Sequence, residues 1–263
     1  MSRKRGPLPE IFKPKKKCVR PAQDEADTQD GDLSSVDMNS MPNDTLAALL
    51  YMKKLFPMEK FDDRIPPIVL KHQLYSIVKN RTIVDKQIND LKESGEIKVI
   101  KLGAEPNELS IVFSRDYEVH VDSVMRDVGV HKHIIEKFLS RVVKNCRDVC
   151  LDRETLMKDY RFKDEEVTQL VRASVLTVRD VGSWWLAIPN AGIFIKNFVR
   201  GRKAMLMMIK KSKYREVLQK DLEQRRWPKM AKLGVMYHIH DVIGADLVEN
   251  IQTTSGKLLR LKE

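Results

Sequence analysis

The chain has 263 residues, a hydrophobic fraction of 42% and a net charge of +11 at pH 7. This length accommodates up to three small domains, and no apolar run approaches the roughly 18 residues that a membrane span needs. The N-terminus lacks the apolar core of a secretory signal, and three cysteines, an odd number, are typical of a reducing compartment. We therefore expect neither a membrane protein nor a secreted, disulfide-rich one.

The charges are unevenly distributed along the chain. Residues 1–20 carry eight Lys and Arg against one Glu, whereas residues 21–45 carry seven Asp and Glu and no basic residue, so these charges cancel. Residues 196–232 carry thirteen Lys and Arg against three Asp and Glu, which is nearly the entire excess. A surplus of this size in one stretch favours a nucleic-acid partner over a merely solvated face.

The first 42 residues are polar, contain proline and have almost no aromatic side chains, so we expect a disordered tail. Two basic clusters separated by a short spacer resemble a bipartite nuclear localisation signal. The alternative is a solvated basic tail without a receptor. The predicted signal comprises Arg3, Lys4 and Arg5, followed by Lys13, Lys15, Lys16 and Lys17.

A helix that runs into a hairpin is predicted next. Val84, Ile88 and Leu91 recur at helical spacing, and Gly95 ends the helix because glycine adopts a left-handed conformation at little cost. Alternating apolar residues then predict two strands, at residues 97–102 and 109–113, joined by a turn at 103–108. A helix followed by a hairpin is the second half of a winged-helix domain, a helix-turn-helix variant.

The same unit recurs at Glu165–Ile188 and, more loosely, at Val235–Leu261. The matching strand residues Ile97, Leu176 and Leu247 lie 79 and 71 residues apart, a spacing that suits small helix-rich domains. We therefore predict an α+β, mostly helical chain of three tandem winged-helix domains after the tail. The predicted domains are residues 43–115, 116–189 and 190–263.

The first two domains are poor candidates for contact with DNA. In the first, Pro66-Pro67 is expected to open a second helix that contains Ile68 and Leu70, and the third helix is close to neutral. In the second, the third helix begins with Asp164-Glu165-Glu166, whose negative charges repel phosphate. We expect these domains to pack or to bind protein. For the adjacent Trp184 and Trp185, one ring facing the core is favoured over stacking on unpaired bases.

In the third domain the basic residues lie before the third helix, which is the helix expected to enter a DNA groove in a winged-helix domain. That helix, Val235–Ala245, contains no Lys, Arg, Asn or Gln to contact base edges. The preceding helices interleave an apolar face with cations, which predicts contacts to the phosphate backbone, with strong salt dependence and little sequence preference. We expect double-stranded DNA to be bound by Lys196, Arg200, Lys203, Lys210, Lys211, Arg215, Arg225 and Arg226.

Metal and kinase chemistry are not supported by the sequence. A zinc site needs four converging ligands, and Cys146 and Cys150 have no histidine pair at a suitable spacing. A kinase needs a glycine-rich loop, a strand lysine, an H-R-D-type loop and a D-F-G site, none of which is present. We therefore expect a non-enzyme without cofactor or metal.

Two segments of the third domain, Phe194–Glu216 and Tyr237–Leu261, closely resemble the serine/threonine-protein kinase 19 family. The segments Ile11–Lys17 and Glu165–Pro189 are similar to the same family. The resemblance implies three winged-helix domains, no true kinase domain despite the name, a nuclear protein and binding of double-stranded DNA. It also implies a role in transcription-coupled nucleotide excision repair.

The resemblance further implies partners and contact residues. The partners are the repair complex on stalled RNA polymerase II, the Cockayne-syndrome ligase subunit and transcription factor IIH, and a homodimer is left open. The family's DNA-contacting positions in the third domain correspond to Lys196, Lys210 and Arg225, which keep their positive charge. The alternatives are a protein-interaction scaffold that does not bind DNA and, least favoured, an atypical serine/threonine kinase.

Overall fold

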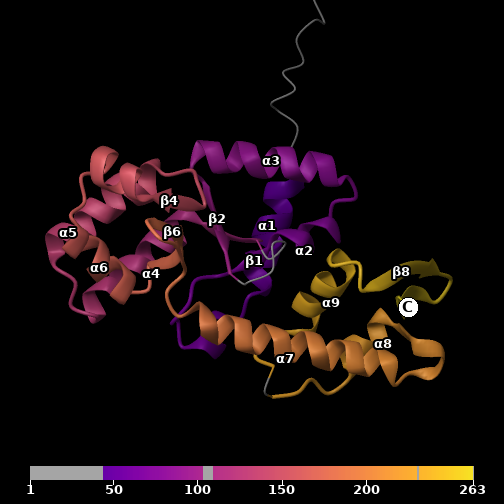
Figure 1. Cartoon of the computed structure of the whole chain (residues 1–263). Coiled ribbons are helices and arrows are strands. Elements are labelled where there is room, and N and C mark those ends of the chain that lie inside the picture. The colour runs from indigo at the N-terminus through magenta and orange to yellow at the C-terminus, as the bar shows by residue number, and fades with distance from the viewer. Residues whose placement is uncertain (1–43, 103–108, 230, 263) are drawn as a thin grey trace, which may run out of the picture. The chain divides into compact units, whose positions relative to one another are not determined.

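One succession of elements occurs three times along the chain (Figure 1). The computed structural model describes residues 44–102, 109–229 and 231–262, all of which fall in one compact unit. The predicted tail and localisation signal, and the predicted turn at 103–108, lie outside the described residues. Each repeat has a helix, a short strand, two further helical segments and a hairpin, so the chain is of the α+β class.

The first repeat comprises α1 Asp44–Leu55, η2 Met58–Phe61, β1 Val69–Leu70, α2 Lys71–Tyr75, α3 Arg81–Ser94, β2 Ile97–Lys101 and β3 Leu109–Phe113. A linking helix, α4 Ser114–Asp127, follows. The second repeat comprises α5 Lys132–Lys137, the π-helical η3 Phe138–Val143, β4 Cys150–Asp152, the π-helical η4 Thr155–Asp159, α6 Asp164–Arg172, β5 Leu176–Asp180 and β6 Ser183–Leu186. The third comprises α7 Ala191–Lys210, η5 Lys213–Arg215, β7 Glu216–Leu218, α8 Gln219–Gln224, α9 Val235–Gly244, β8 Val248–Thr253 and β9 Gly256–Leu261.

Each repeat contains a three-stranded antiparallel sheet with the last strand in the middle. The orders are β1-β3-β2, β4-β6-β5 and β7-β9-β8. The short first strand therefore pairs with the far strand of the hairpin, as Val69 does with Ile111. This arrangement holds the helices between the first strand and the hairpin at a fixed place in each repeat.

The helix and hairpin predicted at residues 84–113 are present. α3 begins earlier than predicted, at Arg81, because the Asn80 side chain accepts a hydrogen bond from the backbone N–H of Ile83. It ends at Gly95, whose φ of 85° is left-handed. The predicted apolar stripe of the helix is buried.

Two parts of the sequence prediction were wrong. Residues Ile68 and Leu70 are not helical, because Val69–Leu70 forms β1 against β3 and the helix starts only at Lys71. The linking helix α4 was not predicted at all, although Tyr117, Val121 and Met125 recur at i, i+4 and i+8 and are buried. The structure of Val69–Leu70 is set by pairing with the distant strand β3, and that of α4 by burial of its apolar face.

One apolar core extends through the first two repeats into the third. It runs from α1 to the start of α7, and it includes Tyr237 on α9. A second, smaller cluster belongs to the third repeat alone and contains Met205, Ile209, Val242 and Leu259. The third repeat is therefore tied to the others through α7 and α9. No helix among the described residues is both long and apolar enough to cross a membrane.

Candidate nucleic-acid interface

The helix α7 presents basic side chains on the face opposite its buried stripe. Phe194, Phe198, Met205 and Ile209 are buried on one side of this 20-residue helix. On the other side, all four predicted cations of the helix are exposed; these are Lys196, Arg200, Lys203 and Lys210. At 1.5 Å of rise per residue, this row is about 21 Å long.

The remaining predicted residues lie beyond the C-terminal end of α7. Lys211 caps the helix, Arg215 ends η5, and Arg225 and Arg226 follow α8; all four are exposed. The structure brings Arg225 to the end of α7, where its Nη1 donates to the Met208 carbonyl oxygen (3.4 Å) and to Ser212 Oγ (3.3 Å). The residues after α8 are thereby held beside the basic helix.

None of the eight predicted cations forms an ion pair with any other residue that the structure describes. Exposed basic groups without acidic partners can neutralise phosphates and release counterions when they bind a nucleic acid. We call this set, on α7 and beyond its C-terminal end, the α7 basic face.

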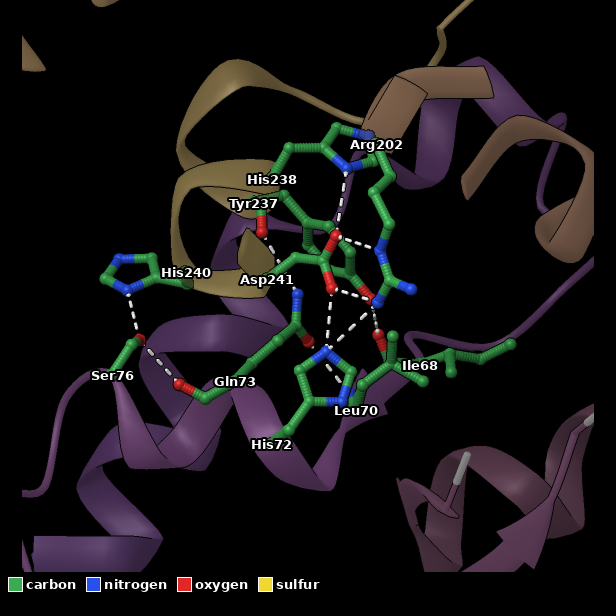
Figure 2. Close-up of polar contacts among 10 residues, drawn as sticks. All are labelled: Ile68, Leu70, His72, Gln73, Ser76, Arg202, Tyr237, His238, His240 and Asp241. Atoms are coloured by element: carbon green, nitrogen blue, oxygen red, sulfur yellow. Dashed lines mark hydrogen bonds and ion pairs between the residues drawn. The ribbon is translucent and has the colours of Figure 1, made fainter. Parts of the chain in front are cut away.

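One basic residue of α7 points the other way. Arg202 donates to the carboxylate of Asp241 through Nε (2.8 Å) and Nη2 (2.5 Å) (Figure 2). His72 Nε2, on α2, lies 2.7 Å from the same carboxylate. Burial disfavours the charged carboxyl of Asp241, but its interactions with Arg202, His238 and His72 outweigh burial and hold the pKa of Asp241 far below its usual range. Asp241 therefore joins α7, α9 and α2.

The helix α9, the last helix of the third repeat, is packed against α2 and α7. None of its ten residues is exposed. The Gln73 side chain donates to the Tyr237 carbonyl oxygen (3.1 Å), and the Tyr237 hydroxyl donates to the Ile68 carbonyl oxygen (2.8 Å). His240 Nδ1 lies 2.8 Å from Ser76 Oγ on α2, and burial lowers the pKa of His240 to about 4 (Figure 2). These contacts hold α9 against α2.

Comparison with known proteins identifies the chain's relatives. The family model described as inactive serine-threonine protein kinase 19 matches residues 39–261. A human protein named Winged helix repair factor 1 is 44% identical over 97% of this chain and 96% of its own length. The protein of the same name from Xenopus laevis is 40% identical over 100% of this chain and 100% of its own length. The one from Mus musculus is 47% identical over 82% of this chain and 85% of its own length. The chain belongs to the inactive serine-threonine protein kinase 19 family. The resemblance stated from the sequence is thus confirmed.

For this member of the kinase 19 family, the sequence pattern did not reveal the buried group around Asp241. Arg202 stands beside the predicted cations Arg200 and Lys203, and composition alone does not separate them. One signal was available, because Asp241 is the one carboxylate in the apolar helix that also holds His238. A buried carboxylate needs a cation, and a nearby arginine is the usual partner.

The described tryptophans and cysteines of this family member have contacts within the protein. Lys101 Nζ and Arg179 Cζ lie 5.1 Å and 4.7 Å from the ring centre of Trp185, whereas Trp184 packs against the core. Cys146 is buried, and Cys150 lies in β4. Among the described residues, no group of three or more His, Cys, Asp or Glu could hold a metal ion.

Proposed function

We propose that the chain is a non-catalytic nuclear adaptor that binds double-stranded DNA and acts in DNA repair, in the transcription-coupled nucleotide excision pathway. The observation that carries the DNA-binding part is the α7 basic face, in which eight exposed cations have no acidic partner among the described residues. The repair part is supported by the printed name of the relatives, Winged helix repair factor 1, at 40–47% identity.

The proposal includes three tandem winged-helix domains, at residues 43–115, 116–189 and 190–263, after a tail that carries the localisation signal. The threefold repeat of helices and sheet, with the same strand order each time, supports this division. The tail's role is tested separately by fusing residues 1–42 to a cytosolic fluorescent protein. We expect the fusion to accumulate in the nucleus and to lose this accumulation when four lysines become alanine: Lys13, Lys15, Lys16 and Lys17. A uniform distribution of the intact fusion would contradict the role.

The proposed binding mode is contact with the DNA backbone. Because α9 has no exposed residue, its side chains have no access to base edges in the major groove. Cations on α7 contact phosphates, which fix position but carry no base sequence directly. We therefore expect similar affinity for unrelated duplex sequences.

The proposed protein partners follow from the family resemblance. They are the repair complex on stalled RNA polymerase II, the Cockayne-syndrome ligase subunit and transcription factor IIH. The first two repeats are proposed to hold these partners, since their last helices, α3 and α6, are near-neutral and acidic. Pull-down of each purified partner by the full chain tests this part, and failure of all three would contradict it.

The test of DNA binding is charge reversal of Lys196, Lys210 and Arg225 to glutamate. The matched control reverses Lys54, Arg115 and Arg172, which are equally exposed and also lack ion pairs among the described residues. Fluorescence polarisation with a random-sequence duplex in low salt should show binding by the wild type and the control, and its loss in the triple variant. Circular dichroism checks that both variants fold. Wild-type affinity in the triple variant would contradict the proposed surface.

Two other functions make different predictions. A scaffold whose basic face meets an acidic protein should not bind random duplex at physiological salt. An atypical kinase should transfer phosphate from ATP in a manner that disappears on mutation of a single acidic residue. The family's description as inactive argues against the kinase, and the exposed cations favour DNA over the scaffold.

A further inference from the structure

The second repeat carries an open cleft of about 610 Å³ beside its first helix. His133, Lys137 and Arg141 follow one another at intervals of four residues along α5 and η3, and Arg161 reaches the cleft from the turn before α6. Arg141 lies in the π-helical segment, a kind of helix distortion that is frequent at functional sites. The cleft is thus bordered by four groups that can donate to an anion. We call it the α5 cleft.

The two carboxylates of the α5 cleft are already engaged. Glu166 accepts hydrogen bonds from Lys137 Nζ (2.6 Å) and from the backbone N–H of Lys163 (2.8 Å). Glu136 lies 3.7 Å from Lys132 Nζ. These partners offset the negative charge that would otherwise repel a phosphate.

The two arginines of the α5 cleft are not engaged with acids. Both Arg141 and Arg161 are exposed, and neither forms an ion pair within the part of the chain that the structure describes. Arg141 Nη1 donates to the Tyr160 carbonyl oxygen (3.0 Å), so its guanidinium is held at the cleft with donors to spare. A planar guanidinium with free donors suits a phosphate.

The α5 cleft and the α7 basic face occupy the same two places in the repeat. In the third repeat, the cations lie on the first helix, α7, and after α8, before the last helix. In the second repeat, they lie on the first helix, α5 with η3, and after η4, before α6. In both repeats an arginine connects these two places by donating to a backbone carbonyl oxygen. Arg225, after α8, donates to Met208 on α7, and Arg141, in η3, donates to Tyr160 after η4.

We propose that the α5 cleft is a second phosphate-binding surface, which holds the backbone of double-stranded DNA through Arg141 and Arg161. This inference rests on the proposed function of the α7 basic face and extends it to a repeat whose last helix has the wrong charge for DNA. The contact again avoids the last helix, so it adds affinity and salt dependence and no base preference.

The test compares Arg141→Glu/Arg161→Glu with Arg115→Glu/Arg172→Glu in the full chain. The two double variants change the net charge equally, and Arg115 and Arg172 lie outside the cleft. Polarisation with a random-sequence 30-base-pair duplex is repeated over a range of salt concentrations. Relative to the control, the cleft variant should bind more weakly, and its slope of log K against log salt should be flatter by about two units. Thermal melting confirms that both are folded.

The outcomes separate this inference from the proposed function. If wild type binds duplex and the triple variant on α7 does not, but the cleft variant matches its control, the second surface is wrong and the proposed function stands. If wild type does not bind duplex, both are wrong. If the cleft variant keeps its DNA affinity but alone loses binding of a labelled poly-glutamate peptide, the cleft takes an acidic protein and the DNA assignment is overturned.

Discussion

Neighbouring basic residues on α7 have opposite roles. Successive residues of a helix point about 100° apart, so Arg202 faces α9 while Arg200 and Lys203 face outward. The side chain of Asp241 is fully buried, and that of Arg202 is 26% exposed. Removing one partner of a buried ion pair destabilises the protein, because the remaining charge stays buried without a counter-charge.

Replacement of Asp241 by alanine should therefore lower the free energy of unfolding by about 3 kcal/mol, since Arg202 and His72 lose their common acceptor. Urea denaturation followed by circular dichroism measures this change. Replacement of exposed Asp221, which forms no ion pair among the described residues, serves as control and should change stability by less than about 0.5 kcal/mol. Equal stability of the two variants would show that the group around Asp241 contributes little.

The low pKa of His240 predicts a loss of stability in mild acid. In the unfolded chain the pKa of histidine is about 6.5, whereas burial lowers it to about 4 in the folded protein. Between these values the unfolded chain binds the proton more strongly, so stability decreases as the pH decreases. From pH 7 to pH 5 the loss due to His240 should be about 2 kcal/mol.

The variant His240→Gln tests this pH dependence, because glutamine is neutral throughout and can still hydrogen-bond Ser76. Urea unfolding at pH 7 and pH 5 should show that the variant loses about 2 kcal/mol less than the wild type. A variant that loses as much stability as the wild type over this range would show that His240 is not protonated on unfolding.

The sequence predicted that the candidate cations of α7 are exposed, but it did not reveal that Arg202 pairs with Asp241. Lys196 and Lys210 could be predicted because charges at helical spacing opposite an apolar stripe must be exposed. Arg202 could not, since its position on the boundary of the stripe allows either direction. Its role depends on Asp241 and His72, which are 39 and 130 residues away.

At the scale of elements, the local signals predicted the hairpins and the last helix of each repeat. Gly95 and the capping Asn80 mark the ends of α3 within the sequence itself. By contrast, β1 is two residues long and exists only because β3 provides its partner. The linking helix α4 was missed although its apolar spacing was present, because the predicted repeat left no place for an additional helix.

The close approach of α9 to α2 depends on Gly244. A Cβ atom added at this position would lie 1.9 Å from the carbonyl oxygen of His72, a backbone atom that cannot move aside. Gly244→Ala should therefore separate the two helices and destabilise the protein by about 2 kcal/mol. Gly234→Ala is the control on the same helix, since its added Cβ would meet nothing within 4 Å.

Urea unfolding of the two glycine variants measures this difference. Gly234 is the N-cap of α9 and has an ordinary φ of −72°, so the control loses only the N-cap preference for glycine over alanine and should lie within about 1 kcal/mol of the wild type. If both variants were as stable as the wild type, α9 would not be packed tightly on α2, and its side chains would be free to reach DNA.

At the scale of the whole molecule, the charge is separated from the helices that would read DNA bases. The last helix of each repeat is near-neutral, acidic or, in α9, without an exposed residue. The excess positive charge lies on α7 and beyond its end, and the eight cations of the α7 basic face have no acidic partners among the described residues. In the proposed account the repeated fold is a scaffold, and phosphate is bound at the α7 basic face and, in addition, at the α5 cleft.

The salt dependence of duplex binding tests this account most directly. For the full chain, log K plotted against log salt should be a steep straight line, and neutralising each phosphate contact should flatten it by about one unit. Replacement of Lys196, Lys210 and Arg225 by glutamine should therefore reduce the slope by about three units, with similar affinity for unrelated sequences. A slope equal to that of the wild type would contradict binding through the α7 basic face.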